Sequence, residues 1–274
     1  MAEQLQVSWG QPVVVENRPG AGGTVGTDAG AKAAPDGYSF LVSDVGPLAM
    51  APSLYANLPY DPVRDFAPVS LIARLPFVLV VNPAVPARSA ADLVALARQR
   101  PGEITYASVG NGSSTHLAME LFRTAEGIQL THVPYRGSAP ALNDVVGGQV
   151  SAMFVNTASS ADLIREGRLR GLAIGSSTPS PILPGVPTLS SALGKEMEAG
   201  VWFGLLAPRS TDEALVRRVS ADVGRALAGQ AVRAKLEGLG AEVESSDPAA
   251  FAALISAERN RWGPVVRASG ARIE

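Results

Sequence analysis

The stretch Pro76-Phe77-Val78-Leu79-Val80-Val81-Asn82 is a continuous apolar run that ends at a proline, Pro83. A second run of this kind, Val201-Trp202-Phe203-Gly204-Leu205-Leu206-Ala207-Pro208, lies far downstream. Each run lies beside a loop-like stretch, as is typical where a chain passes from one domain into another. Two such crossings predict a hinge between two lobes. We expect lobe I to comprise residues 1–81 and 207–274, and lobe II to comprise residues 82–206.

Short apolar runs alternate with helical patterns along almost the whole chain, which predicts an α/β fold with parallel sheets. The strand candidates are residues 13–16, 38–42, 76–82, 104–107, 130–133, 150–155, 169–174, 201–206 and 241–244. Several of these runs are continuous and rich in β-branched residues, like parallel strands buried on both faces. So many strands favour two sheets, and we expect a mostly parallel sheet flanked by helices in each lobe.

Capping residues predict where several helices begin. Ser89 with Asp92 predicts a helix over residues 90–100. Ser210 with Glu213 predicts a capping box for a helix that runs to about residue 228.

Both ends of the chain also carry helical patterns. Asp247 before Pro248 is typical of an N-cap followed by proline at the first helical position. One face of the segment that follows consists of Phe251, Leu254, Ile255, Glu258, Trp262, Val265 and Val266. We interpret this mostly apolar face as core packing rather than a cofactor site. Residues 1–9 resemble the tail of a helix that stops at Gly10, and residues 1–10 contain no signal-peptide core.

Composition excludes several classes of function. The chain of 274 residues has 23 Lys and Arg against 25 Asp and Glu, a net charge of −2, which lacks the basic surface that nucleic-acid binding needs. It has no Cys, which excludes disulfides, thiolate zinc sites, iron–sulfur clusters and cysteine nucleophiles. Aromatic residues make up only 5%, so the core must be mainly aliphatic.

The first glycine cluster is Arg18-Pro19-Gly20-Ala21-Gly22-Gly23-Thr24-Val25-Gly26, between a predicted strand and a helix. The spacing of a dinucleotide-binding fingerprint fails, because Val25 stands where the third glycine is required. Two interpretations stay open. The cluster is either a tight turn with positive φ, or a helix N-terminus at which Gly20 and Gly22 approach an anion.

The second cluster is Tyr106-Ala107-Ser108-Val109-Gly110-Asn111-Gly112-Ser113-Ser114-Thr115-His116-Leu117. A strand again leads into a loop of small polar residues, and a helix follows. One of Ser113, Ser114 or Thr115 caps that helix, but three successive hydroxyls exceed what a cap requires. We therefore predict a ligand-binding loop, with simple capping as the alternative. The predicted ligand-binding residues of this loop are Ser108, Gly110, Asn111, Ser113, Ser114 and Thr115, with His116 as a further possibility.

Other chemistry-bearing residues point away from catalysis. The two histidines, His116 and His132, lack any metal-ligand spacing, and His116 with Glu120 is at most a surface pair. No nucleophile elbow is present, and no spacing nominates a pair of carboxylates. We expect no catalytic residue, no metal and no cofactor. Arg136, on a turn after a predicted strand, either binds a carboxylate through its two-pronged guanidinium or lies in solvent.

The sequence resembles the Bug family, the solute-binding receptors of tripartite tricarboxylate transporters. The stretches that carry the resemblance are QPVVVENRPGAGG (residues 11–23), AAPDGY (33–38), YASVGNGS (106–113), HL (116–117), VPYRG (133–137), LNDVVGGQV (142–150) and GRLRGLA (167–173). The resemblance runs from about residue 11 to the C-terminus of the chain.

The resemblance implies a periplasmic binding protein of the two-lobed, hinge-closing type II class, without catalytic activity. Such a protein captures a small carboxylated solute in the cleft between its lobes and presents it to the membrane components of the transporter. It also implies a monomer. From lobe I, Ser43, Asp44 and Gly46 would contribute to the site. Asp44 departs from the small neutral residues common in the family, and it would favour a solute with an amino group. Asn156 occupies a place where an acidic residue is common.

The start of the chain departs from the family pattern. Family members open with a signal peptide, a strand and a Pro-Gly-Gly loop that clamps a carboxylate, whereas residues 1–5 here align with the helix after that loop. The absent strand would lie between residues 13–16 and 38–42. Losing three or four buried aliphatic side chains, at about 1.5–3 kcal/mol each, rivals the net stability of a domain, ~5–15 kcal/mol. We therefore expect the given sequence to be a truncated form of a longer chain.

Two other functions stay open. An α/β enzyme acting on a small organic acid, either a dehydrogenase or a hydrolase, would share the fold class, although the broken glycine fingerprint and the absent nucleophile elbow argue against it. The sensor lobes of a transcription regulator would share the two-lobed architecture, although the sequence contains no basic helix-turn-helix.

Overall fold

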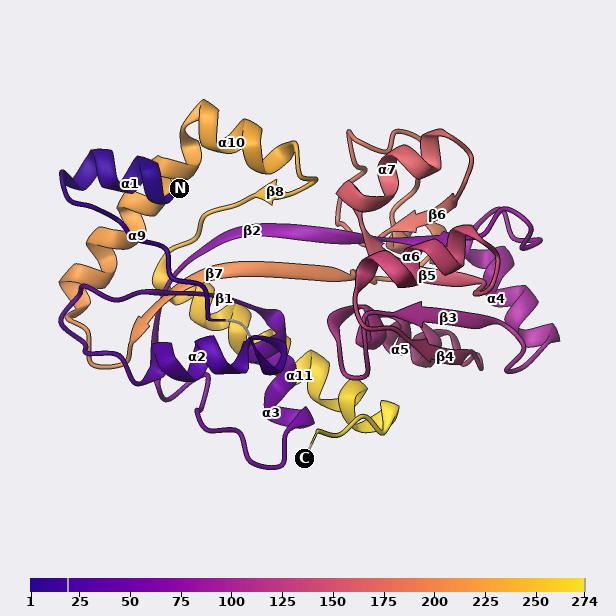
Figure 1. Cartoon of the computed structure of the whole chain (residues 1–274), viewed down its shortest axis with the longest axis horizontal. Coiled ribbons are helices and arrows are strands. Elements are labelled where there is room, and N and C mark those ends of the chain that lie inside the picture. Colours follow the sequence, from indigo (N-terminus) through magenta and orange to yellow (C-terminus); the bar gives the residue numbers. More distant parts are fainter. Residues whose placement is uncertain (19, 274) are drawn as a thin grey trace. The chain divides into compact units, whose positions relative to one another are not determined.

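The computed structural model describes residues 1–18 and 20–273 (Figure 1). Pro19, part of the first glycine cluster, and Glu274, the end of the expected lobe I, lie outside the described residues. The chain divides into two compact units: unit 1 is Met1–Arg74 with Trp202–Glu274, and unit 2 is Leu75–Val201. The divisions fall inside β2 (Phe66–Val81) and β7 (Gly200–Pro208), the strands that contain the two apolar runs.

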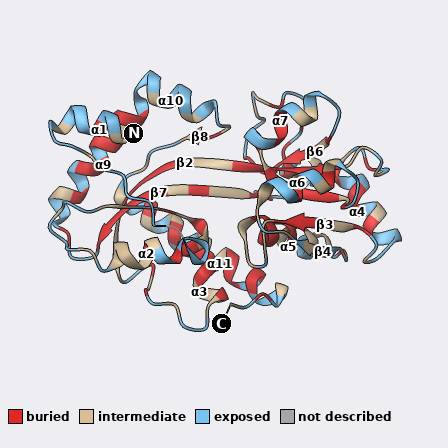
Figure 2. Cartoon of the chain, in the orientation of Figure 1, coloured by how far each residue is buried: buried red, intermediate tan, exposed pale blue. Residues whose placement is uncertain are grey.

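Unit 2 is built on one sheet with the strand order β4-β3-β5-β2-β6. The strands β4 (Thr131–Pro134), β3 (Thr105–Ser108) and β5 (Ala152–Asn156) run parallel. The C-terminal part of β2 pairs antiparallel with β5 on one side and with β6 (Arg170–Ile174) on the other. Most residues of β3, β5, β6 and the C-terminal part of β2 are buried, whereas the edge strand β4 has no buried residue (Figure 2).

Helices cover both faces of this sheet. They are α4 (Ala90–Gln99), α5 (Ser114–Glu126), α6 (Ser138–Val146), α7 (Thr157–Arg165) and α8 (Leu189–Leu193). Side chains alternate along β2: Leu79 joins the core that contains Phe122 of α5, whereas Val80 joins the core that contains Val145 of α6. The continuous apolar run in the sequence thus reflects a strand buried on both faces.

Unit 1 combines short strands with longer helices. Its elements are α1 (Ala2–Trp9), the 3₁₀ turn η1 (Ala21–Gly23), α2 (Thr24–Ala31), β1 (Leu41–Asp44), the π-helical η2 (Gly46–Met50), α3 (Ala51–Leu54), α9 (Glu213–Ala228), α10 (Gln230–Glu237), β8 (Glu242–Val243) and α11 (Pro248–Ser269). The strand β1 pairs antiparallel with β7, and β8 pairs antiparallel with the N-terminal part of β2.

The core of unit 1 forms where α11 packs on η2 and β7. Phe251, Ile255, Trp262, Val265 and Val266 of α11 are buried, which confirms the interpretation of its apolar face as core packing. The ring of Phe251 meets Trp202 edge to face, with centroids 5.6 Å apart. Glycine is required at position 204 of β7, because a methyl group there would overlap the Phe251 ring.

Most capping predictions are confirmed, and one is wrong. Ser89 and Asp92 form a full capping box at α4, and Asp247 caps α11 by accepting a hydrogen bond from the Ala250 amide at 2.7 Å. The cap of α9 is Asp212, which accepts from the Leu215 amide, and not Ser210. Asp212 directly precedes the first helical residue, which is the position an N-cap must occupy.

The structure corrects two further expectations. Residues 13–16 form no strand, and Val14 and Val15 are 87% and 67% exposed, because no described strand lies beside them to pair with. The sheets are also less parallel than expected: among the described residues, the parallel strand pairs are β3 with β4 and β3 with β5, with two isolated parallel bridges besides, whereas the pairings of β1 with β7 and of β2 with β5, β6 and β8 are antiparallel. Strand β2 belongs to both units, and its direction opposes that of the strands beside it.

Among the described helices, none has the length and apolar character that crossing a bilayer demands.

The substitution Gly204→Ala tests the contact between β7 and α11. We expect it to lower the free energy of unfolding by about 1–3 kcal/mol, because the added methyl group must displace the buried Phe251 ring. Urea denaturation measures the change. The matched control is Gly224→Ala inside α9, where a methyl group meets nothing closer than 3.7 Å; it should be neutral or stabilising by up to about 1 kcal/mol. Equal effects of the two substitutions would contradict the packing described.

Candidate functional site

The carboxyl ends of β3, β4 and β5 lie at one edge of the unit 2 sheet, because these strands are parallel. The chain leaves β3 through α5 toward β4 on one side, and it leaves β5 through α7 toward β6 on the other. The helices accordingly pack on opposite faces, α5 in one core and α7 in the other. Ligands of open α/β sheets bind at such a reversal, outside the carboxyl ends of the strands. The loops after β3 and β5 flank this point.

The loop after β3 is a tight turn over Gly110–Ser113. The Ser113 amide donates to the Gly110 carbonyl at 3.2 Å and closes the turn. Gly110 has φ +130° and Gly112 has φ +73°, values that residues with a side chain rarely adopt. Positive φ at the third position of a turn is what a type II turn requires. The glycines that first suggested a binding loop therefore define the path of its backbone.

Two of the expected ligand-binding hydroxyls hold the loop itself. The Ser113 hydroxyl donates to the Gly110 carbonyl at 2.7 Å and accepts from the His116 amide at 3.3 Å, which makes Ser113 the N-cap of α5. The Thr115 hydroxyl accepts from the Val109 amide at 3.1 Å. The prediction that one of the three hydroxyls caps the helix is confirmed. Two of the three hydroxyls, rather than one, are used in hydrogen bonds within the loop and the helix start.

Donors that no described group engages remain at the start of α5. The side chains of Asn111 and Ser114 make no hydrogen bond within residues 1–18 and 20–273. The amides of Ser114 and Thr115 lie in the first helical turn, where no carbonyl one turn back is available to accept. The positive end of the helix dipole adds to the attraction for an anion. This end of α5 is thus equipped to hold a carboxylate without a cationic side chain.

Behind the loop lies a polar network whose members are buried except for His132, which is half-buried. Ser108 Oγ accepts from the Gly110 amide at 3.1 Å and lies 2.6 Å from Nε2 of His132. His116 Nδ1 accepts from the Gly112 amide at 3.0 Å. The two imidazole rings stack with centroids 4.0 Å apart, and Tyr106 stacks on His132 at 4.8 Å.

The network ends in a buried carboxylate. Glu120 accepts from the Tyr106 hydroxyl at 2.8 Å and pairs with Arg123 at 2.6 Å. Burial opposes the charge on Glu120, but the hydrogen bonds from Arg123 and Tyr106 outweigh it, so the pKa of Glu120 is lowered. Burial and the neighbouring Glu120 raise the pKa of Tyr106, which stays protonated and donates. His116 and Glu120 are 4% and 5% exposed, so the prediction of at most a surface pair is wrong.

Arg136 and Asn156 follow the neighbouring strands at the same edge. The Tyr135 amide donates to the Ser108 carbonyl at 3.0 Å, which puts the adjacent Arg136 beside the start of the loop. Arg136 is exposed. Asn156 Oδ1 accepts from the Ser159 amide at 2.8 Å and caps α7. Unit 2 therefore carries all of its predicted residues at the ends of β3 and β5 or on the segments that follow β3, β4 and β5: Ser108, Gly110, Asn111, Ser113, Ser114, Thr115, His116, Arg136 and Asn156.

The remaining predicted residues lie in unit 1. The Ser43 hydroxyl is buried and lies 3.1 Å from the Thr27 hydroxyl. Asp44, at the end of β1, accepts from the Gly46 amide at 2.7 Å; burial raises its pKa and this hydrogen bond lowers it in part. Gly20 and Gly22 have φ +137° and +63°, which confirms positive φ in the first glycine cluster.

The sequence alone does not indicate Tyr106, His132 or Glu120 as parts of this site. One signal was available: Tyr106 and His132 stand side by side in the parallel register of β3 and β4, two residues before each strand ends. Polar rings on adjacent strands just before a glycine-rich loop indicate a shared network. The spacing of His116 and Glu120 along a helix could not reveal their burial.

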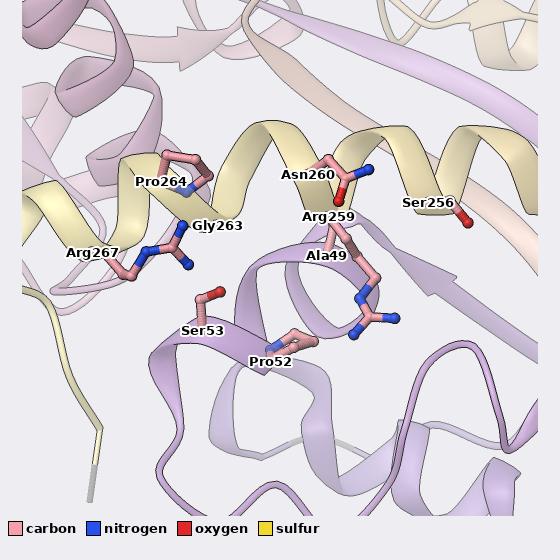
Figure 3. A pocket seen from close by; sticks show the side chains of 9 residues that line it. All are labelled: Ala49, Pro52, Ser53, Ser256, Arg259, Asn260, Gly263, Pro264 and Arg267. Carbon is pink, nitrogen blue, oxygen red and sulfur yellow. The ribbon is translucent and has the colours of Figure 1, made fainter.

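A separate hollow lies within unit 1, between α3 and α11 (Figure 3). It has a volume of about 490 Å³ and is lined by Ala49, Pro52, Ser53, Ser256, Arg259, Asn260, Gly263, Pro264 and Arg267. Figure 3 shows Arg259 and Arg267 extending from α11 toward α3. The hollow is polar and open, unlike the enclosed, mostly apolar sites of small molecules. It is lined by none of the predicted site residues.

Residues 1–271 match TctC, the tripartite tricarboxylate transporter family receptor. The chain belongs to this family. Protein BugT of Bordetella pertussis is 41% identical over 275 aligned positions, which cover 100% of this chain and 84% of BugT. The resemblance to the Bug family is thereby confirmed. Because TctC proteins are receptors, the prediction of a binding protein rather than an enzyme is confirmed as well.

Two solved structures similar to this chain contain carboxylates. R. palustris Rpa4515 with adipate has a TM-score of 0.83 and 36% identity, and the match covers 98% of this chain and 90% of that chain. MatC from Rhodopseudomonas palustris with bound malate has a TM-score of 0.79 and 33% identity, with 97% and 91% covered. A third solved structure, that of periplasmic binding protein BugD, has a TM-score of 0.81 and 33% identity, with 100% of this chain and 92% of that chain covered. These similarities confirm the α/β fold of a two-lobed periplasmic binding protein.

The substitution Tyr106→Phe tests the buried network. We expect it to lower the free energy of unfolding by about 1–2 kcal/mol, because Glu120 loses a buried hydrogen bond and keeps only Arg123. Urea denaturation measures the change. The control is Tyr38→Phe, the same chemical change at a side chain that is 92% exposed, and it should stay within about 0.5 kcal/mol of the parent. An unchanged free energy of unfolding in Tyr106→Phe would contradict the role given to this hydroxyl.

Proposed function

We propose that the protein is a periplasmic receptor that binds a small carboxylated organic solute and delivers it to the membrane components of a tripartite tricarboxylate transporter. The observation that carries the solute class is the N-terminus of α5, where the Ser114 and Thr115 amides and the Ser114 hydroxyl have no partner within the described chain. Membership of the TctC family supports the transporter and the compartment.

The chemistry of the loop favours an oxyanion over a cation, and the ligands of two similar proteins favour a carboxylate among oxyanions. Helix amides and hydroxyls offer several hydrogen bonds to an oxyanion, and no cationic side chain lies within the loop itself. Arg136, the adjacent cation, suits a planar carboxylate because its guanidinium donates two parallel hydrogen bonds. Adipate in Rpa4515 and malate in MatC are small dicarboxylates, so we expect a solute of this class here.

The proposed solute contacts in unit 2 are Ser108, Gly110, Asn111, Ser113, Ser114, Thr115, Arg136 and Asn156. Since the hydroxyls of Ser113 and Thr115 hold the turn, we expect these two residues to contribute mainly their backbone. Ser43, Asp44 and Gly46 of unit 1 remain proposed contacts, and a solute held between the lobes remains a prediction. Asp44 favours an amino group on the solute, because its second carboxylate oxygen is left to accept.

Titration calorimetry with adipate, malate and the uncharged diamide of adipic acid tests the proposal. We expect at least one of the two acids to bind with a micromolar or lower Kd, and the diamide to bind at least about a hundredfold more weakly, because charge-assisted hydrogen bonds are roughly twice as strong as neutral ones. Each tenfold in Kd corresponds to about 1.4 kcal/mol. Absence of binding by any carboxylate, in a protein that unfolds cooperatively, would refute the proposed function.

The substitution Ser114→Asp locates the site. An aspartate in the first turn favours the helix, so the fold should survive, but its charge repels a bound carboxylate and should raise Kd at least tenfold. The control is Ser89→Asp, which adds the same charge at the N-cap of α4, where aspartate also caps, and should leave Kd unchanged. Equal Kd values for the two variants would place carboxylate binding away from α5.

A further inference from the structure

Two amides of the turn are engaged from behind by the histidine pair. The Gly112 amide donates directly to Nδ1 of His116, and the Gly110 amide donates to Ser108 Oγ, which contacts Nε2 of His132. With these two amides pointing inward, the amides of Ser114 and Thr115 are left for a ligand. His116 lies on α5 and His132 on β4, so the pair ties the loop to the sheet and to the helix at once.

We propose that His116 and His132 form an uncharged, stacked imidazole pair that holds the turn Gly110–Ser113 in its anion-receiving shape, with His116 as a positioning residue for carboxylate binding. This inference rests on the proposed function, because it assigns the carboxylate to the same loop. It differs from the sequence expectation, in which His116 itself touches the ligand.

The hydrogen-bond geometry requires His116 to be neutral. Nδ1 can accept from the Gly112 amide only when it carries no proton. In an imidazolium, the Nδ1–H group and the Gly112 N–H group would both be donors and would repel each other. A charge on either ring would also repel a charge on the other across the 4.0 Å stack. His132 is less constrained, since the Ser108 hydroxyl can donate to Nε2 or accept from it.

The surroundings favour the neutral form. The titratable groups that face His116 are Tyr106 of β3, His132 of β4, and Glu120 and Arg123 of α5. Burial, together with His132, lowers the pKa of His116 to about 4 against the opposing influence of Glu120. Burial likewise lowers the pKa of His132. As the pH falls, the unfolded chain therefore takes up a proton at His116 before the folded protein does, and His116 stays neutral in the folded state across pH 6–8.

A neutral pair has a consequence for the ligand chemistry. A histidine that bound the carboxylate through its charge would titrate near its ordinary pKa of about 6.5, so affinity would rise as the pH falls from 8 to 6. A neutral positioning pair predicts an affinity that is constant over this range for a solute whose carboxylates are fully ionised. The two roles of histidine are thereby separable by a pH profile.

The test compares His116→Asn with His116→Leu. Asparagine keeps an acceptor oxygen at the δ position but cannot titrate, whereas leucine fills the space and accepts nothing. We expect His116→Leu to raise Kd for the adipate or malate that binds the parent at least tenfold, and His116→Asn to stay within about threefold. Thr124→Leu, at an exposed position of the same helix, is the control for added apolar volume and should match the parent.

Amide hydrogen exchange by NMR supplies a readout that does not depend on any ligand. The Gly112 amide should be protected in the parent and in His116→Asn, and unprotected in His116→Leu. Imidazole nitrogen shifts should show both histidines neutral from pH 6 to 8. If the parent binds no carboxylate, the proposed function fails, and these two measurements still decide whether the histidines hold the turn.

Three results would overturn the inference. Unchanged affinity in folded His116→Leu would show that the acceptor is dispensable. Equal losses in the leucine and asparagine variants would show that the ring itself, and not its acceptor, matters. An affinity that rises severalfold as the pH falls from 8 to 6 would show that an imidazolium binds the carboxylate.

Discussion

The hydrogen bond from the Gly112 amide to Nδ1 of His116 is the contact on which the candidate site depends. A tight turn at the start of a helix leaves several amides without helical acceptors, and each buried one must find another. The histidine pair and Ser108 satisfy two of them, and the hydroxyls of Ser113 and Thr115 satisfy two more. The amides of Ser114 and Thr115 are left without an acceptor among the described residues. The loop can therefore bind a ligand only through the amides that its own hydrogen bonds do not use.

That turn is held in place by the sheet beneath it. Parallel pairing of β3 with β4 and β5 gathers three loops at one edge, and the antiparallel β2 supports β5 from its other side. The side chains of β2 alternate between two cores, so both helical layers pack on a strand that contributes no group to the site. The loop after β3 therefore stands on a buried, well-packed base, as a preorganised binding loop requires.

Much of this arrangement could be predicted from patterns that are local in the sequence. The caps Ser89 and Asp247 and the glycine–serine loop each carry their own signal, and each lies where expected. The apolar run over residues 76–82 also indicates a strand correctly, although β2 begins earlier than predicted, at Phe66. What failed depends on distant partners. Residues 13–16 look like a strand but have no described neighbour to pair with, and the burial of Glu120 depends on Tyr106 and Arg123 together. The sequence pattern predicts Ser113 and Thr115 as ligand contacts, because it does not show that their hydroxyls bond to the loop itself.

The central claim is that a solute carboxylate is held by the first-turn amides of α5 without a charged histidine. A crystal structure of the protein with the tightest-binding dicarboxylate tests it most directly. The account predicts a carboxylate oxygen at about 2.7–3.1 Å from the amide nitrogens of Ser114 or Thr115, with the Gly112 amide still on His116. A carboxylate bound instead between Arg259 and Arg267 in the hollow of unit 1, or one in direct contact with His116, would contradict it.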